Sequence, residues 1–101
     1  MSRISLELVP DPKQIENGIH HLQSIVSGVS AINIPDLPDK FSVRSWEACA
    51  LQELSGYSRI AHIRASDCDP DQPLPFANAV NKGAVTELLL VSGDPLNSLR
   101  K

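Results

Sequence analysis

The sequence has few of the features that mark membrane, secreted or nucleic-acid-binding proteins. Its 101 residues include only 2 cysteines, and 9 Lys plus Arg stand against 12 Asp plus Glu, for a formal net charge of −3. The apolar run Leu88–Val91 is far shorter than the roughly 20 residues that a membrane-spanning helix needs. The first residues, Met1–Ser5, contain no apolar stretch suited to a signal peptide.

These absences exclude several classes of function. The acidic balance gives neither the basic footprint of a nucleic-acid-binding protein nor a polybasic patch for a membrane surface. Cys49 and Cys68 form no CxxC pair, so we expect no disulfide, no zinc site and a cytoplasmic location. The acidic segment Asp67–Asp71 lacks the glycine and final carboxylate of a calcium loop, so we predict no metal site.

The chain does have a regular alternation of strand and helix patterns. Strand periodicity or continuous apolar character predicts four strands, at residues 3–9, 29–34, 59–64 and 85–91. Helical spacing of apolar residues predicts three helices between them, at residues 12–26, 46–54 and 74–81. We expect Asp11 and Ser45 to cap the first two helices, and Gly28, Gly56 and Gly83 to end the three.

The order β-α-β-α-β-α-β predicts an α/β fold with a parallel sheet and right-handed crossovers. A spacing of about 25 to 30 residues between strands is typical of one unit of a (β/α)8 TIM barrel. We therefore interpret residues 1–101 as one domain, a partial TIM barrel that forms its amino-terminal half. A complete barrel needs about 200 to 250 residues, so we expect a fragment or a chain that pairs with another half. The apolar fourth strand is expected to be covered on both faces.

Polar side chains stand at the carboxyl end of every predicted strand, where parallel α/β proteins bind ligands. The strands deliver, in order, Glu7, Asn33 with Asp36, His62 and Arg64 with Asp67, and Gly93 with Asp94. If Glu7 points inward, desolvation raises its pKa and suits it to general acid catalysis; otherwise it is a solvated edge carboxylate. His62 is either a ligand-site residue or a packed, hydrogen-bonded histidine. The Gly93-Asp94 step is either a ligand contact or an ordinary turn.

Three of these segments, at residues 5–10, 61–65 and 90–95, together resemble the methylenetetrahydrofolate reductase family. That family has a first strand that ends in Glu and then Pro, a third strand that carries a His, and a fourth that ends in Gly-Asp-Pro. The chain departs from the family at Arg64-Ala65, which replace a Thr-Cys step, and at Ser92, where Arg is common. Its second strand ends in Asn33 and Ile34 followed by a proline-containing loop, instead of a Thr-containing, Gly-rich segment. The resemblance is therefore to a divergent member.

The resemblance implies a flavin-dependent oxidoreductase of one-carbon and folate metabolism, which serves methionine biosynthesis. Members reduce 5,10-methylenetetrahydrofolate to 5-methyltetrahydrofolate with FAD as cofactor and NAD(P)H as electron donor. By motif, Glu7 and Asp94 would be catalytic, and His62, Gly93, Asp94 and Asn33 would contact the flavin. The implied partners are the folate substrate and either the missing barrel half or a second copy of the chain.

Two other interpretations remain open at this point. The chain could be a non-catalytic half-barrel that regulates or completes a partner, because open strand edges favour association. It could also belong to a folate- or corrinoid-linked methyltransferase barrel, a class that also holds pterins at the strand ends.

Overall fold

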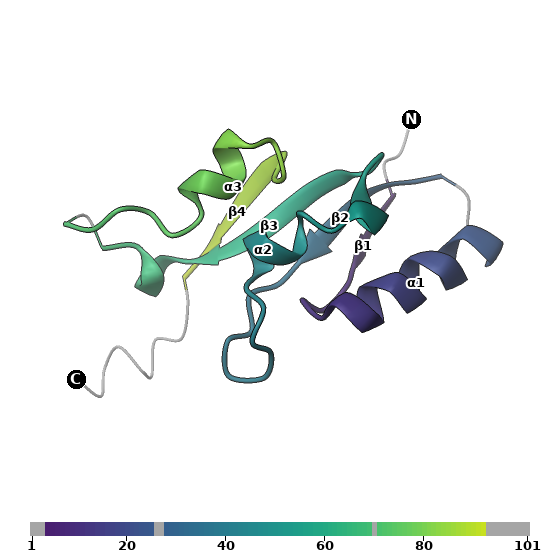
Figure 1. The fold of residues 1–101 in the computed structure, drawn as a ribbon, viewed down its shortest axis with the longest axis horizontal. Helices are drawn as coiled ribbons and strands as arrows, with labels where there is room; N and C mark the ends of the chain where they lie inside the picture. The colour runs from purple at the N-terminus through teal and green to yellow at the C-terminus, as the bar shows by residue number, and fades with distance from the viewer. Residues whose placement is uncertain (1–3, 26–27, 70, 93–101) are drawn as a thin grey trace.

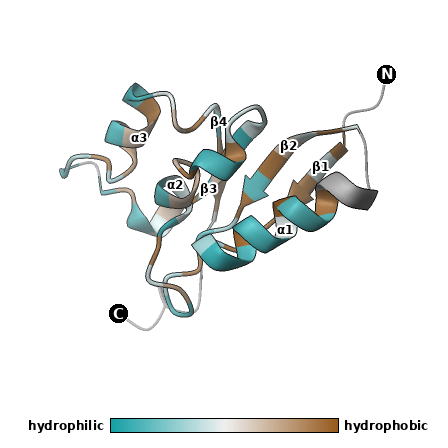
Figure 2. Ribbon diagram, turned by 45° about the vertical axis from the view of Figure 1, so that its right-hand side comes forward, coloured by the Kyte–Doolittle hydropathy of each residue, from teal (hydrophilic) through white to brown (hydrophobic). Residues whose placement is uncertain are grey.

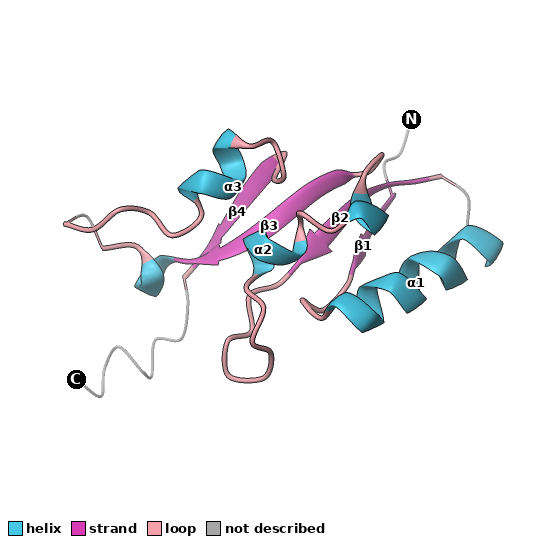
Figure 3. Cartoon of the chain, viewed as in Figure 1, coloured by secondary structure: helices cyan, strands magenta, loops and turns pink. Residues whose placement is uncertain are grey.

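The fold is an α/β arrangement built on a single parallel sheet. The computed structural model describes residues 4–25, 28–69 and 71–92. The sheet has the order β1-β2-β3-β4, and its strands are Ile4–Glu7, Val29–Ile34, Ser58–Arg64 and Glu87–Val91. Every neighbouring pair is parallel, and the four strands lie side by side in chain order (Figure 3). The predicted parallel α/β fold is therefore confirmed.

Helices follow the first three strands, as the alternation predicts (Figure 1). They are α1 (Pro12–Ile25), α2 (Ser45–Ala48) and α3 (Ala77–Asn81), with short 3-10 turns at Gln52–Leu54 and Ala65–Asp67. The Asp11 carboxylate accepts a 3.1 Å hydrogen bond from the backbone N–H of Gln14, so the predicted cap of α1 is confirmed. No helix within the described residues is long and apolar enough to cross a membrane.

The second helix is much shorter than predicted. A continuous helix over residues 46–54 is wrong, because α2 stops at Ala48 and Leu51 takes an extended backbone conformation before the 3-10 turn. Because of this break, the Gln52–Leu54 turn packs against α1, and the Leu54 side chain is completely buried. Ser45 is also not the cap: Arg44 holds that position, and its backbone N–H donates a 2.8 Å hydrogen bond to Glu47 Oε1.

One face of the sheet carries the hydrophobic core, to which the helices contribute. The strand side chains in this core are Ile32, Ile34, Ala61 and Ile63. The helical segments add Ile15, Ile19 and Leu22 from α1, Trp46 and Ala48 from α2, and Phe76 at the start of α3. In Figure 2 the ribbon of α1 alternates between hydrophilic and hydrophobic, as expected for a helix with one buried side.

The opposite face of the sheet has no helix over it among the described residues, and we call it the open face. Strand side chains alternate in direction and register partners share a side. This places on the open face Ser5, Glu7, Ala31, Asn33, Ser58, Ile60, His62, Arg64, Glu87, Leu89 and Val91. All of these except the small and buried Ala31 are partly or fully exposed. The sheet therefore has an apolar covered face and an open face rich in polar groups.

The fourth strand differs from the expectation that both of its faces are covered. Leu88, Leu89 and Leu90 are all exposed, and within the described chain β4 pairs only with β3. The sequence pattern correctly marks a strand that is apolar on both sides. In this chain that strand is an edge, because no described element lies beyond it.

The contrast between core and edge predicts two different responses to the loss of side-chain atoms. Ile63 and Leu90 are register partners on neighbouring strands, but Ile63 is 1% exposed and Leu90 is 66% exposed. We expect Ile63→Ala to lower the free energy of unfolding by about 2–5 kcal/mol through lost burial and cavity formation. Leu90→Ala should change it by less than about 0.5 kcal/mol. Urea denaturation of both variants measures the difference, and equal losses would contradict it.

Candidate functional site

Two of the predicted site residues contact each other on the open face. His62 Nε2 lies 3.2 Å from Asn33 Oδ1, across the β2–β3 pair. Because an amide oxygen only accepts, the Nε2 atom carries the hydrogen, and in a neutral ring Nδ1 is left as an acceptor. The pair therefore presents an oriented imidazole at the carboxyl end of the sheet.

Of the other predicted site residues, Glu7 lies on the same face as this pair. Glu7 is the register partner of Asn33 on β1, so it shares the open face and the same end of the sheet. Its side chain is exposed, so the described chain does not provide the desolvation that an inward-facing general acid requires. Gly93 and Asp94 lie outside the described residues.

A buried carboxylate organises the loop that follows β2. The Asp36 side chain is 0% exposed and is held by Arg44, whose Nη2 donates a 2.6 Å hydrogen bond to Oδ2 and whose Nε lies 3.0 Å from Oδ1. The backbone N–H of Ser45 donates a further 3.0 Å bond to Oδ1. The hydrogen bonds to Asp36 raise the pKa of Arg44, so the guanidinium stays charged. A buried charge is tolerated when it is paired and hydrogen-bonded in this way.

Arg44 also reaches the segment that follows β3. Its Nη2 donates a 2.7 Å hydrogen bond to Asp67 Oδ2, and its Cζ lies 4.6 Å from the centre of the Trp46 ring. Trp46 in turn meets Phe76 edge-on, with ring centres 6.1 Å apart. One guanidinium thus connects the loop after β2, the start of α2 and the turn after β3.

The same corner is attached to the strand that carries His62. The Ser45 hydroxyl donates a 2.7 Å hydrogen bond to the backbone carbonyl of His62, so it fixes the backbone beneath the imidazole. Sequence reasoning found Asp36 and Asp67 as strand-end residues but missed Arg44 and assigned Ser45 only a capping role. No short motif marks Arg44, because its two partners stand 8 and 23 positions away in the chain.

A different arginine holds together the amino ends of the strands. The Arg59 guanidinium donates to the backbone carbonyls of Leu54, Tyr57, Gly83 and Ala84, at 2.7 to 3.4 Å. These carbonyls belong to the two segments that lead into β3 and β4. Arg59 therefore fixes loop positions, and these bonds use four of its five donors.

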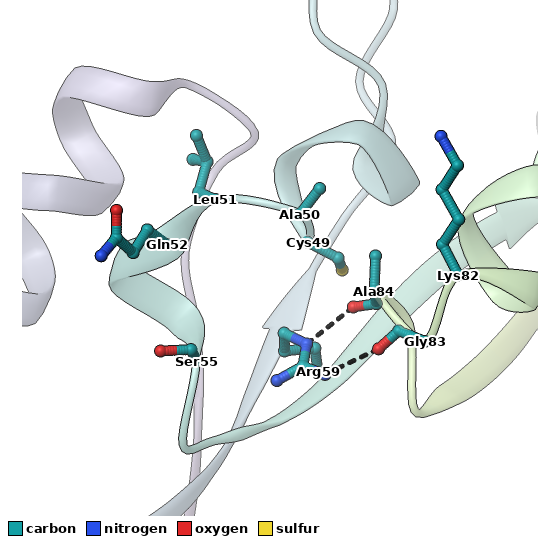
Figure 4. Close-up of a pocket in the computed structure, with 9 residues that line it drawn as sticks. All are labelled: Cys49, Ala50, Leu51, Gln52, Ser55, Arg59, Lys82, Gly83 and Ala84. Atoms are coloured by element: carbon teal, nitrogen blue, oxygen red, sulfur yellow. Dashed lines mark hydrogen bonds between the residues drawn. The ribbon is translucent and has the colours of Figure 1, made fainter.

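The described cavities lie away from the predicted site. A cavity of about 350 Å³ is lined by Cys49, Gln52, Arg59 and Lys82 among others, at the amino ends of β3 and β4 (Figure 4). A second, of about 380 Å³, lies between α2 and α3 and includes Trp46 and Ala79. In the close-up the Lys82 side chain extends away from Arg59, so the two cations do not converge on one point. Neither cavity presents a set of groups suited to chemistry.

No family model, no curated protein and no solved structure matches the chain. Among the described residues, no group of three or more His, Cys, Asp or Glu side chains is gathered so that it could hold a metal ion.

The Asp36–Arg44 pair predicts a large stability effect. In Arg44→Gln the buried Asp36 carboxylate loses its positively charged partner. The hydrogen bond from the Ser45 backbone N–H is then the remaining one that stabilises its charge. We expect the free energy of unfolding to fall by about 3–5 kcal/mol, as is typical when one partner of a buried pair is removed. Lys40→Gln, an exposed change in the same loop, is the control and should have an effect below about 0.5 kcal/mol. Chemical denaturation that ranks the two variants equally would contradict this role for Arg44.

Because the Cys49 thiol is buried, we expect the folded state to become less stable at alkaline pH. Burial raises the pKa of its thiol from 9.0 to about 11, and the nearby Arg59 charge lowers it only in part. Since the unfolded chain ionises first, stability is intact below pH 9 and falls as the pH rises from 9 to 11. Cys49→Ala should remove that part of the pH dependence in denaturation curves.

In thiol labelling at pH 8, Cys49 should also react far more slowly than the partly exposed Cys68, and equal rates would contradict the burial.

Proposed function

We propose that this chain forms the first half of a flavin-dependent (β/α)8 barrel of the methylenetetrahydrofolate reductase type. The strand order β1-β2-β3-β4 and the core on a single face are the arrangement that a barrel wall has, with helices outside and the other face toward the interior. The proposed reaction is reduction of 5,10-methylenetetrahydrofolate to 5-methyltetrahydrofolate, with electrons from NAD(P)H.

One observation carries the proposal: Glu7, Asn33 and His62 share the open face at the carboxyl ends of their strands. In barrels this end of the interior face is where substrates and cofactors are bound. Three strands contribute one polar group each, which is the distribution expected for an active site assembled from strand ends. The resemblance of the sequence segments around Glu7, His62 and Asp94 to the reductase family supplies the reaction type.

The residues present fit a flavin in their hydrogen-bonding chemistry. The isoalloxazine ring has both donors and acceptors at its edge, and the Asn33 amide and His62 Nδ1 offer complementary groups on the open face. A bound flavin supplies hydride transfer, which no side chain of this chain can provide. Glu7 is proposed to donate the proton that activates the methylene group of the folate, and Asp94 is proposed as a flavin and folate contact on the resemblance alone.

A second candidate function is favoured by the exposed fourth strand. Leu88, Leu89 and Leu90 form an apolar edge that would be covered in a complete barrel by further strands and helices. On this alternative the chain is a non-catalytic partner that completes another half-barrel. Sedimentation of the purified chain tests its self-associating form, because a well-folded monomer at high concentration would exclude pairing of two copies through this edge.

The reductase proposal predicts that the chain binds FAD through the open face. We expect added FAD to show a shifted absorbance spectrum and quenched fluorescence, and His62→Ala to weaken the affinity about tenfold, which corresponds to about 1.4 kcal/mol. Asn33→Ala should have a smaller effect in the same direction, because it frees the imidazole to rotate. Glu7→Gln should leave FAD binding unchanged, since Glu7 is assigned to the folate step.

Lys82→Gln, at the amino ends of the strands, is the matched control and should bind FAD like the parent chain. No FAD binding, or binding that is equally strong in His62→Ala, would overturn the reductase proposal. A bound corrinoid in place of flavin would favour the methyltransferase alternative instead.

A further inference from the structure

Arg64 occupies the last position of β3 on the open face. It follows His62 by two residues, so both side chains leave the strand on the same side, and its register partner on β4 is Val91. The reductase family has a different residue type at this step, so the resemblance assigns Arg64 no role. Its position alone puts a cation at the mouth of the proposed site.

The guanidinium of Arg64 is largely covered but donates no hydrogen bond within the described residues. Only 21% of its side chain is exposed, and its one ion contact is a 3.9 Å approach of Nε to Asp67 Oδ2. That oxygen already accepts a 2.7 Å hydrogen bond from Arg44. A guanidinium has five donors. Among the described residues no buried side-chain nitrogen lacks a partner, so the unbonded nitrogens of Arg64 remain in contact with water. Acceptor atoms of a ligand can therefore reach these donors and take the place of that water.

The other two described arginines show how differently this chain uses the same side chain. Arg44 directs its Nε and Nη2 donors to the carboxylates of Asp36 and Asp67, and Arg59 donates to four backbone carbonyls. Both serve the fold, one at each end of the sheet. Among the three described arginines, Arg64 is the one whose guanidinium is not engaged by a hydrogen bond to another described residue.

We infer that Arg64, beside His62, is an oxyanion-binding residue that receives a phosphate or carboxylate group of the ligand. The planar fork of a guanidinium matches the paired oxygens of both groups, which compact cations do not. Asp67 does not prevent this, because its charge is already shared with Arg44. This inference rests on the proposed function only for the identity of the molecule: on a flavin the anion is the phosphate, and on a folate it is the glutamate carboxylate.

Paired ligands with and without the anion test the inference on the full chain. FMN and FAD carry phosphate whereas riboflavin does not, and folate carries carboxylates whereas 6-methylpterin carries none. If the flavin phosphate binds Arg64, Arg64→Gln should weaken FMN and FAD roughly 10- to 100-fold and leave riboflavin unchanged. If the glutamate tail binds there, the same variant should weaken folate and leave 6-methylpterin unchanged. If Arg64→Gln weakened the binding of all three anionic ligands, FMN, FAD and folate, by less than twofold, the inference would be overturned.

Inorganic pyrophosphate separates this inference from the proposed function. We expect pyrophosphate to raise the melting temperature of the parent chain and of Lys82→Gln, which removes a charge at the opposite end of the strands, but not of Arg64→Gln. Arg64-dependent stabilisation without any FAD binding would support the oxyanion site and reject the reductase. FAD binding that ignores Arg64 would reject the oxyanion site and leave the reductase proposal intact, and a chain that bound neither would reject both.

Discussion

The Asp36 carboxylate is the constraint on which the carboxyl end of the sheet depends. It is buried completely, and it accepts hydrogen bonds from Arg44 and from the Ser45 backbone. Because an unpaired charge is costly in that environment, the loop after β2 must hold Arg44 against it. Arg44 then brings in Asp67, and Ser45 bonds to the carbonyl of His62. The position of the imidazole thus follows from a carboxylate on a neighbouring loop.

The two ends of the sheet are stabilised by different means, with consequences for where chemistry can occur. At the amino ends the Arg59 guanidinium donates to backbone carbonyls, so these bonds specify loop geometry regardless of the side chains in those loops. At the carboxyl ends the interactions include the side-chain pairs of Arg44 with Asp36 and Asp67. Asn33, His62 and Arg64 remain partly exposed at this end. The cavities gather on the helical side near the amino ends, whereas the polar groups gather on the open face. A search guided by hollows alone would therefore miss the polar cluster.

Much of the fold could be predicted from local patterns, whereas the contacts at the site could not. The strand at 29–34 and the Asp11 cap follow from periodicity and capping chemistry, which act over a few residues. The break in the second helix depends on where Leu54 is buried, which is a tertiary fact. The strand-end rule placed Asn33 and His62 at one edge, but their contact depends on the β2–β3 register. Arg44 was missed because its partners are distant in sequence.

The exposed β4 has a consequence for how the chain behaves during synthesis and storage. Its segment Glu87–Val91 is short, rich in branched apolar residues, free of proline and carries one charge. Segments of this composition at an unprotected edge add strands from other molecules readily, by backbone pairing that needs no specific recognition. Because such pairing is intermolecular, aggregation through this edge increases with protein concentration. A lysine within these leucines would act as a gatekeeper and extend the life of the purified protein in solution.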